Sequence, residues 1–160
     1  MDIEVVQADY THPDHARDIP LLLNEYAKDP MGGGCALAEE VQQALVSKLA
    51  KIPHAFSILA YVNGEPAGLV NCFEAFSTFA CKPIINIHDV VVLGHYRGAG
   101  LSQKMLALVE DIARERGCCK VTLEVLSKNE VAKSAYRKFG FSGYELDPET
   151  GVALFWEKKL

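Results

Sequence analysis

The sequence predicts an α/β (α+β) fold with a mixed, largely antiparallel central sheet of six to seven strands, flanked by about four helices. Two patterns predict it: apolar residues recur at helical spacing in four segments, and alternating or β-branched runs mark seven others. Turn residues separate these segments. In chain order they read βααβββαβαββ, so we expect the antiparallel strands to cluster in the middle and the helices to cover both faces of the sheet.

The first part of the chain predicts one strand and two helices. Residues 3–8 alternate as a short strand, and a helical pattern over residues 19–27 stops at Pro30. The glycine-rich segment 31–34 is expected to be a flexible connection. Apolar residues spaced by four then predict a second helix over residues 37–49.

The sequence pattern changes from helical periodicity to that of strands after residue 54. Residues 55–62 and 67–76 flank Asn63-Gly64, and this dipeptide is the strongest short signal for a hairpin turn. Residues 84–93 form the longest β-branched run, which predicts a central strand.

The last part of the chain returns to helices separated by strands. A long helix begins near Ala99 and ends at Gly117, where glycine is favoured as a helix terminator. The remaining predicted elements are a strand over residues 120–126, a helix over 130–139, and two strands over 141–146 and 152–158.

Length and charge limit the classes of protein. The 160 residues fit one domain, 1–160, in which 1–54 hold the first strand and two helices and 55–160 hold the sheet core. The net charge of −5 disfavours a nucleic-acid binder. No apolar run is long enough to span a membrane, and the N-terminus lacks the pattern of a signal peptide. Five cysteines without a C-x-x-C pair indicate reduced thiols and a cytoplasmic location.

The most informative stretch is Arg97-Gly-Ala-Gly-Leu-Ser102, which joins a buried strand to an amphipathic helix. Glycines allow a close backbone approach, and the free amides of a helix N-terminus favour an anion, so this turn predicts a phosphate or pyrophosphate site. A tight turn that binds nothing is the alternative. The lysine of a P-loop is absent, and the third glycine of a dinucleotide fingerprint is replaced by Gln103, so both nucleotide interpretations are weak.

A second motif follows the next strand. Asn129 is a favourable N-cap, and Asn129, Ala132 and Tyr136 fall at spacings of three and four, on one face of a helix. The small Ala132 would admit a ligand, and Tyr136 would present its hydroxyl one turn further on.

Together, Arg97-Gly-Ala-Gly-Leu-Ser102 and Asn129-x-x-Ala132-x-x-x-Tyr136-x-x-x-Gly140-Phe141 resemble the GNAT superfamily of N-acetyltransferases. The resemblance implies acetyl-CoA as co-substrate, held where the strand 84–93 separates from the strand 120–126. It implies these binding positions: backbone at Val90, Val91 and Val92; Arg97 with the amides of Gly98, Ala99, Gly100, Leu101 and Ser102; and Asn129, Ala132 and Tyr136. It also implies that Tyr136 lies near the sulfur. Ser102 and Gly94 depart from the family pattern at positions where we expect the change to be tolerated.

An N-acetyltransferase needs a group that takes a proton from the amine and a donor to the departing thiolate. We expect Tyr136 to be the donor. His88 and Asp89 compete for the other role, directly or through a water. Strand alternation places these two on opposite faces, and His88 is preferred because its reference pKa lies near neutral pH. His88 also departs from the glutamate that some relatives carry there.

The acceptor predicted from the resemblance is a small-molecule primary amine, such as a polyamine or another amino compound, attacking directly in a ternary complex. It would enter against residues 26–37, with Phe73, Phe76 and Phe79 shaping its pocket. We expect no metal, nucleic-acid or membrane partner, and a homodimer is one assembly compatible with this interpretation. The alternatives are a non-catalytic acyl-CoA sensor and a nucleotide-binding module.

Overall fold

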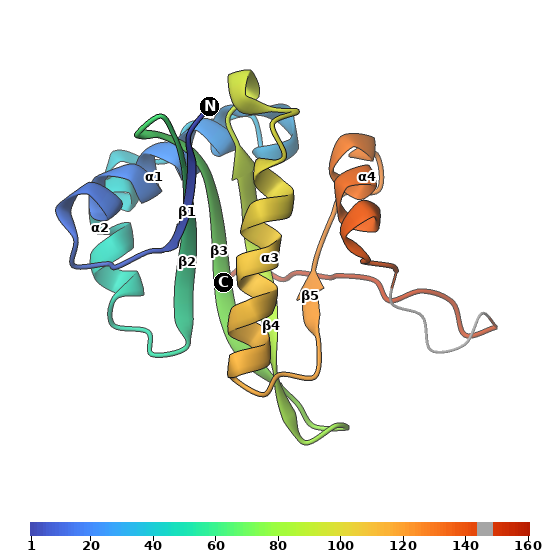
Figure 1. Cartoon of the computed structure of the whole chain (residues 1–160). Coiled ribbons are helices and arrows are strands. Elements are labelled where there is room, and N and C mark those ends of the chain that lie inside the picture. Colours follow the sequence, from blue (N-terminus) through green and yellow to red (C-terminus); the bar gives the residue numbers. More distant parts are fainter. Residues whose placement is uncertain (144–148) are drawn as a thin grey trace.

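The computed structural model describes residues 1–143 and 149–160, and one sheet organises them (Figure 1). Its strands lie in the order β1-β2-β3-β4-β5. All neighbours are antiparallel except β4 and β5, which are parallel, so the sheet is mixed as predicted. The strands are β1 (Ile3–Gln7), β2 (Ala55–Val62), β3 (Glu65–Ser77), β4 (Lys82–Val92) and β5 (Val121–Leu123).

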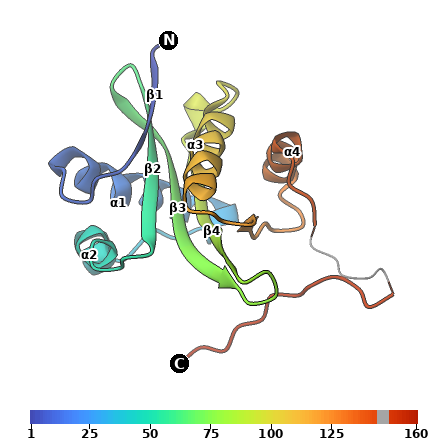
Figure 2. The ribbon, with the colours of Figure 1, turned by 60° about the horizontal axis from the view of Figure 1, so that its bottom comes forward.

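Helices cover both faces of this sheet (Figures 1 and 2). One face carries α1 (Pro13–Lys28) and α2 (Glu39–Leu49), the other carries α3 (Leu101–Glu115), and α4 (Glu130–Phe139) lies beyond β5 near one end of α3. Two short 3-10 turns, η1 (Pro30–Gly32) and η2 (Gly94–Tyr96), follow α1 and β4. The predicted helices 19–27, 37–49, 99–117 and 130–139 are therefore confirmed, although the first begins six residues earlier, at Pro13, and the others differ by no more than two residues at their ends.

Strand alternation creates two separate cores. Ile58 and Ala60 of β2 pack with Met105 of α3, whereas Leu59 between them packs with Leu22 of α1. All five side chains are fully buried. Because burying an aliphatic side chain of this size contributes about 1.5–3 kcal/mol, these two cores fix which face of the sheet each helix covers.

The β2–β3 connection has the predicted hairpin geometry. Asn63 and Gly64 both adopt left-handed backbone conformations, with φ of 50° and 82°. Positive φ at both central residues is the requirement of the tight turn whose twist matches the flanking strands.

A bulge interrupts β4 at its middle. Asn71 of β3 pairs with Asp89, and the next residue, Cys72, pairs with Ile87, so His88 has no partner on β3. An extra residue of this kind bends the strand and changes where the neighbouring side chains point.

The prediction of six to seven strands is wrong: the sheet has five among the described residues. The predicted strand 152–158 is absent, and four of its apolar side chains are between 66% and 84% exposed: Val152, Leu154, Phe155 and Trp156. The predicted strand 141–146 is not a strand over 141–143, and residues 144–146 lie outside the described residues. Alternation of apolar and polar residues shows only that a segment could form a strand. To do so it must also pair with the free edge of a neighbouring strand.

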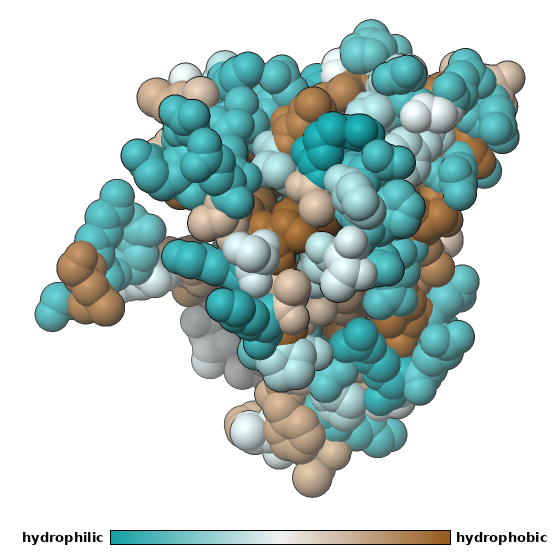
Figure 3. Space-filling model, turned by 90° about the vertical axis from the view of Figure 1, so that its left-hand side faces the viewer, coloured by the Kyte–Doolittle hydropathy of each residue, from teal (hydrophilic) through white to brown (hydrophobic). Residues whose placement is uncertain are grey.

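The surface on the side of α1 and α2 is mostly hydrophilic, with apolar areas between the polar side chains (Figure 3). Among the described residues, no helix combines the length and apolarity required to cross a membrane.

Candidate functional site

The glycine turn between β4 and α3 has the backbone geometry that its sequence requires. Gly98 and Gly100 have φ of 84° and 78°, a region that side chains with a Cβ rarely adopt. Gly100 is also the N-cap of α3, and it offers no side chain to cap the helix. The turn therefore leaves the first amides of α3 without the usual capping group.

These amides are available to a ligand. Within the described part of the chain, the amides of Gly98 and Gly100 donate no hydrogen bond to another backbone group. The first free N–H groups of α3 carry the positive end of its dipole. Ala99 packs partly against the core and Leu101 is buried, whereas Arg97 is exposed and Ser102 half-buried, so the last two lie at the surface of the turn. The chemistry of this donor set fits a phosphate group.

Beside this turn, β4 continues past the end of β5. The two strands pair only from Ile85 and Val121 to Ile87 and Leu123. Val90, Val91 and Val92 pair with β3 on the other edge, so in this stretch the edge facing β5 has no strand partner among the described residues. Val91 lies in the core under α1, while Val90 and Val92 pack against the core under α3.

Across this gap stands α4, and it carries the second motif. The Asn129 side-chain oxygen accepts a hydrogen bond from the Ala132 amide at 3.2 Å, so Asn129 is the N-cap as predicted. The Tyr136 ring packs edge-on against Phe141, with ring centroids 6.0 Å apart. Burial, together with the nearby Tyr26 hydroxyl, raises the pKa of Tyr136 to about 12. The phenol is therefore a neutral donor at any physiological pH.

The segment after α1 lies close to the glycine turn. The Asp29 carboxylate lies 3.8 Å from the Arg97 guanidinium and accepts a hydrogen bond from the Met31 amide. The Asp29 carbonyl accepts from the amides of Gly32 and Gly34. Residues 31–34, expected to be a flexible connection, are thus held by one aspartate that also faces the predicted phosphate site.

His88 and Asp89 lie on the same face of the sheet, so the prediction that alternation separates them is wrong. The Phe73 ring meets the His88 ring edge-on at 5.6 Å, and the Asn71 amide donates to the Asp89 carboxylate at 3.0 Å. Asn71 and Phe73 are two residues apart on β3 and point to the same side. The bulge at His88 explains why both side chains share a face: the extra residue interrupts the alternation, so His88 and Asp89 no longer point to opposite sides.

These two side chains have different surroundings. His88 is exposed and Asp89 is half-buried. Burial, with the nearby carboxylates of Asp89 and Asp29, raises the pKa of Tyr26 on α1. Tyr26 therefore lies within electrostatic range of Asp89 on β4 and of Tyr136 on α4.

Of the three phenylalanines predicted to shape an acceptor pocket, the structure brings only Phe73 to the site. Phe79 is 99% exposed and Phe76 is 57% exposed, both near the end of the β3–β4 hairpin. The polar residues Tyr26, Asp29 and Asn71 were not identified individually from the sequence. Only the tertiary structure brings these three residues together, since each comes from a different segment and none belongs to a motif.

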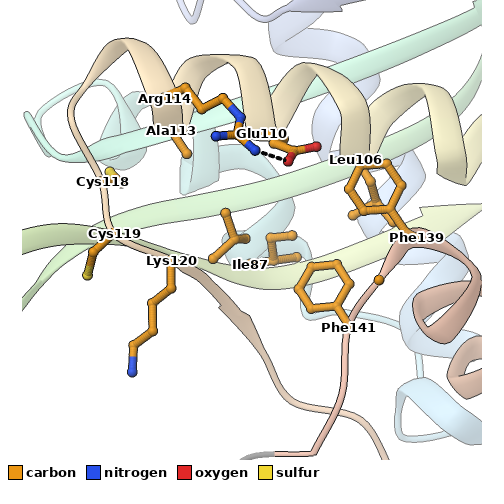
Figure 4. A pocket seen from close by; sticks show the side chains of 12 residues that line it. Ile87, Leu106, Glu110, Ala113, Arg114, Cys118, Cys119, Lys120, Phe139 and Phe141 are labelled. Carbon is orange, nitrogen blue, oxygen red and sulfur yellow. Dashed lines mark hydrogen bonds and ion pairs between the residues drawn. The ribbon is translucent and has the colours of Figure 1, made fainter.

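Two cavities follow the outer side of β5 rather than the glycine turn. The larger, about 720 Å³, is lined by residues that include Leu123, Lys133 and Tyr136. The smaller, about 230 Å³, lies between α3 and the end of α4, with the Phe139 ring beside Leu106 (Figure 4). Tyr136 thus borders both the gap beside β4 and the larger cavity.

The comparisons with known proteins agree with this geometry. The model of the acetyltransferase (GNAT) family matches residues 19–141. The uncharacterised N-acetyltransferase YhfO of Bacillus subtilis is 31% identical over 90 residues, which are 56% of this chain and 58% of that protein. The thialysine N-epsilon-acetyltransferase of Caenorhabditis elegans is 25% identical over 126 residues, 78% of this chain and 75% of that protein. The chain thus spans little more than half the length of the first of these relatives.

Solved structures show the same fold. AAC(6')-Iy, in complex with the bisubstrate analogue CoA-S-monomethyl-acetylneamine, aligns with a TM-score of 0.77 at 16% identity, covering 100% of both chains. The family match spans both motifs, which form the turn before α3 and the first turns of α4. The chain belongs to the GNAT family of acetyltransferases.

Proposed function

We propose that the protein transfers an acetyl group from acetyl-CoA to a primary amine of a small molecule. The observation that carries this proposal is the arrangement around the free edge of β4. The unpaired amides of Gly98 and Gly100 lie at one end of it, and Tyr136 stands on the helix across the gap. A pyrophosphate and an extended arm that ends in a thioester would use both features.

In this proposal each group has a defined task. The turn from Gly98 to Ser102, with Arg97, holds the pyrophosphate. The backbone from Val90 to Val92 holds the extended arm through its free edge, while Asn129 and Ala132 line the α4 side. Arg97 would exchange its contact with Asp29, 3.8 Å away, for the phosphate charge.

The reaction requires three proton movements. An alkyl ammonium must first lose a proton to His88 or Asp89, because only the neutral amine has a free electron pair. Its nitrogen then bonds to the acetyl carbon, and the carbon–sulfur bond breaks with its electrons going to sulfur. The Tyr136 phenol gives its proton to the thiolate and recovers one from the nitrogen of the new amide. Direct attack without an acetylated residue is consistent with this arrangement.

The surroundings of the gap favour a cationic acceptor. The carboxylates of Asp29 and Asp89 are both close enough to Tyr26 to raise its pKa, and the whole chain has a net charge of −5. Negative potential at an entrance raises the local concentration of a positively charged amine. A polyamine or a small amino compound, of the kind named for the thialysine enzyme, meets this requirement.

Two measurements test the proposal. Acetyl-CoA should raise the melting temperature while ATP and NAD should not, since a ligand that binds only the folded state stabilises it by mass action. Release of coenzyme A thiol should then be followed with a panel of amines. No thermal shift at millimolar acetyl-CoA would rule out the proposed co-substrate; a shift without thiol release from any amine would instead support an acyl-CoA sensor. A cytoplasmic location and a homodimer stay predictions of the sequence.

A further inference from the structure

A row of hydrogen-bonded polar side chains crosses the face of the sheet under α1. Ser57 of β2, Asn71 of β3 and Asp89 of β4 are direct partners in the strand register. The Tyr10 hydroxyl lies 2.8 Å from the Ser57 oxygen, the Ser57 hydroxyl lies 2.7 Å from the Asn71 oxygen, and the Asn71 amide lies 3.0 Å from the Asp89 carboxylate. We call these four residues the polar ladder.

The direction of the hydrogen bonds follows from Asp89. An ionised carboxylate only accepts, so the Asn71 amide group must face it and the Asn71 oxygen must face Ser57. Ser57 therefore donates to Asn71, and its oxygen accepts from Tyr10. All the donors point the same way, toward the carboxylate. Such a chain polarises each bond in turn and strengthens the last one.

The ladder is unusual for its location. Ser57 is 0% exposed and Asn71 is 4% exposed, on a face of the sheet where the other buried strand residues, Leu59, Leu69 and Val91, are aliphatic. Apolar residues at these positions would avoid the cost of removing polar groups from water. The ladder ends on the half-buried Asp89 carboxylate beside the gap, which indicates a functional role for this carboxylate.

We propose that Tyr10, Ser57 and Asn71 are positioning residues that hold the Asp89 carboxylate to take the proton from the acceptor ammonium. This inference rests on the proposed function and selects between its two proton acceptors. His88 is exposed on the bulge, and its ring meets Phe73 only edge-on. Asp89 accepts a hydrogen bond from Asn71, whose own orientation is fixed by Ser57 and Tyr10, so the carboxylate reorganises less when the reaction occurs. The proton passes from nitrogen to a carboxylate oxygen and later to solvent.

The test compares variants at Asn71, at the two candidate acceptors and at a control position. Asn71→Leu keeps the shape but removes the donor, and Asn71→Asp places a second carboxylate against Asp89. Asn86→Leu is the matched control, because the Asn86 amide also donates across strands, to the Thr122 hydroxyl at 3.2 Å, outside the ladder. His88→Gln and Asp89→Asn remove each proton acceptor.

We expect Asn71→Leu to lower kcat by about tenfold or more while the KM for acetyl-CoA stays within about threefold, the pattern of lost positioning rather than lost binding. Asp89→Asn should lower kcat by about 100-fold or more, and His88→Gln and Asn86→Leu by less than about threefold. In Asn71→Asp the acid limb of the kcat profile should move to higher pH, because a like charge disfavours ionisation. Two titratable groups interact electrostatically with Asp89: Tyr26 of α1, and Cys72 of β3, which is buried on the other face of the sheet; His88 precedes Asp89 on the same face.

A carbon-13 NMR titration of the Asp89 carboxyl group separates this inference from the proposed function. The titration midpoint should rise in Asn71→Leu and rise further in Asn71→Asp, whether or not the substrate is known. Unchanged midpoints, or equal losses of kcat in Asn71→Leu and Asn86→Leu, would overturn the ladder. Loss of turnover in His88→Gln with an active Asp89→Asn would overturn it as well. Midpoints that move as expected in a protein that acetylates no amine would instead contradict the proposed function.

Discussion

The phenol of Tyr136 combines a binding surface with a proton donor, and a single substitution separates them. Tyr136→Phe keeps the ring that packs against Phe141, so we expect the affinity for acetyl-CoA to stay within a few fold. Turnover should fall by about 100-fold or more if the hydroxyl gives its proton to the thiolate. Isothermal titration and steady-state rates from pH 6 to 10 measure the two effects. An unchanged turnover number, with the chemical step rate-limiting, would leave Tyr136 as a packing residue and water as the donor.

The same residue makes a prediction about pH. Because its pKa is raised to about 12, the phenol should stay protonated throughout that assay, and turnover in the parent should show no decline from Tyr136 below about pH 10. A decline near the ordinary pKa of tyrosine, absent from Tyr136→Phe, would contradict the burial of this hydroxyl in the active protein.

The raised pKa of Tyr136 also links stability to pH. The folded state holds the phenol proton more tightly than the unfolded chain does, so the stabilisation is complete below about pH 10 and is lost as pH rises toward 12. From pH 9 to pH 11 the parent should lose about 1 kcal/mol more free energy of unfolding than Tyr136→Phe. Urea denaturation at the two pH values measures this difference. Tyr10 and Tyr26, whose pKa values are also raised by burial, contribute equally to both proteins. Equal losses would show that Tyr136 ionises as it does in the unfolded chain.

At the scale of elements, the turn before α3 can be tested through its backbone. Gly100→Val should raise the dissociation constant for acetyl-CoA by at least about tenfold, a loss of roughly 1.4 kcal/mol. A Cβ at Gly100 would meet nothing within 4 Å, so the effect comes from forcing a branched residue to φ of 78°, not from a collision within the protein. Gly94→Val is the matched control, since that position is equally open and has no positive φ. Equal affinities in both variants and the parent would place the phosphate site elsewhere.

Local signals in the sequence predicted most of these elements, for physical reasons that differ between them. Pro30 and Gly117 mark helix ends because proline lacks the N–H group of the next helical hydrogen bond and glycine tolerates φ of 72°. The bulge at His88 could not be predicted. β-Branched residues stand on both sides of it, at Ile87 and Val90, and nothing in the pattern marks an extra residue. Both the turn and α4 were identified from motifs. The polar ladder was not, because its members meet only when four segments come together.

For the whole molecule, the difference from the predicted fold lies at the open edge of the sheet. β5 has only three residues, and within the described part of the chain it pairs with β4 alone. The alternating segment 152–158 was expected to extend the sheet, but its side chains point into solvent. Whether a segment pairs is decided by the partner edge and by long-range contacts, which the local pattern does not contain.

Trp156 makes the position of this segment measurable, because it is the one tryptophan of the sequence. Its side chain is 84% exposed, so we expect solvent-like fluorescence emission and quenching by acrylamide close to that of a free indole. Leu154→Lys should then change the free energy of unfolding by no more than about 0.5 kcal/mol, as usual for a surface position. Leu59→Lys, in the core under α1, is the contrasting variant and should prevent folding or cost several kcal/mol. A blue-shifted emission at every protein concentration would mean that residues 152–158 dock within the chain, and the five-stranded sheet would be incomplete. A blue shift that grows with concentration would instead show that a second copy covers this apolar segment, since contiguous exposed apolar surface often marks an interaction site.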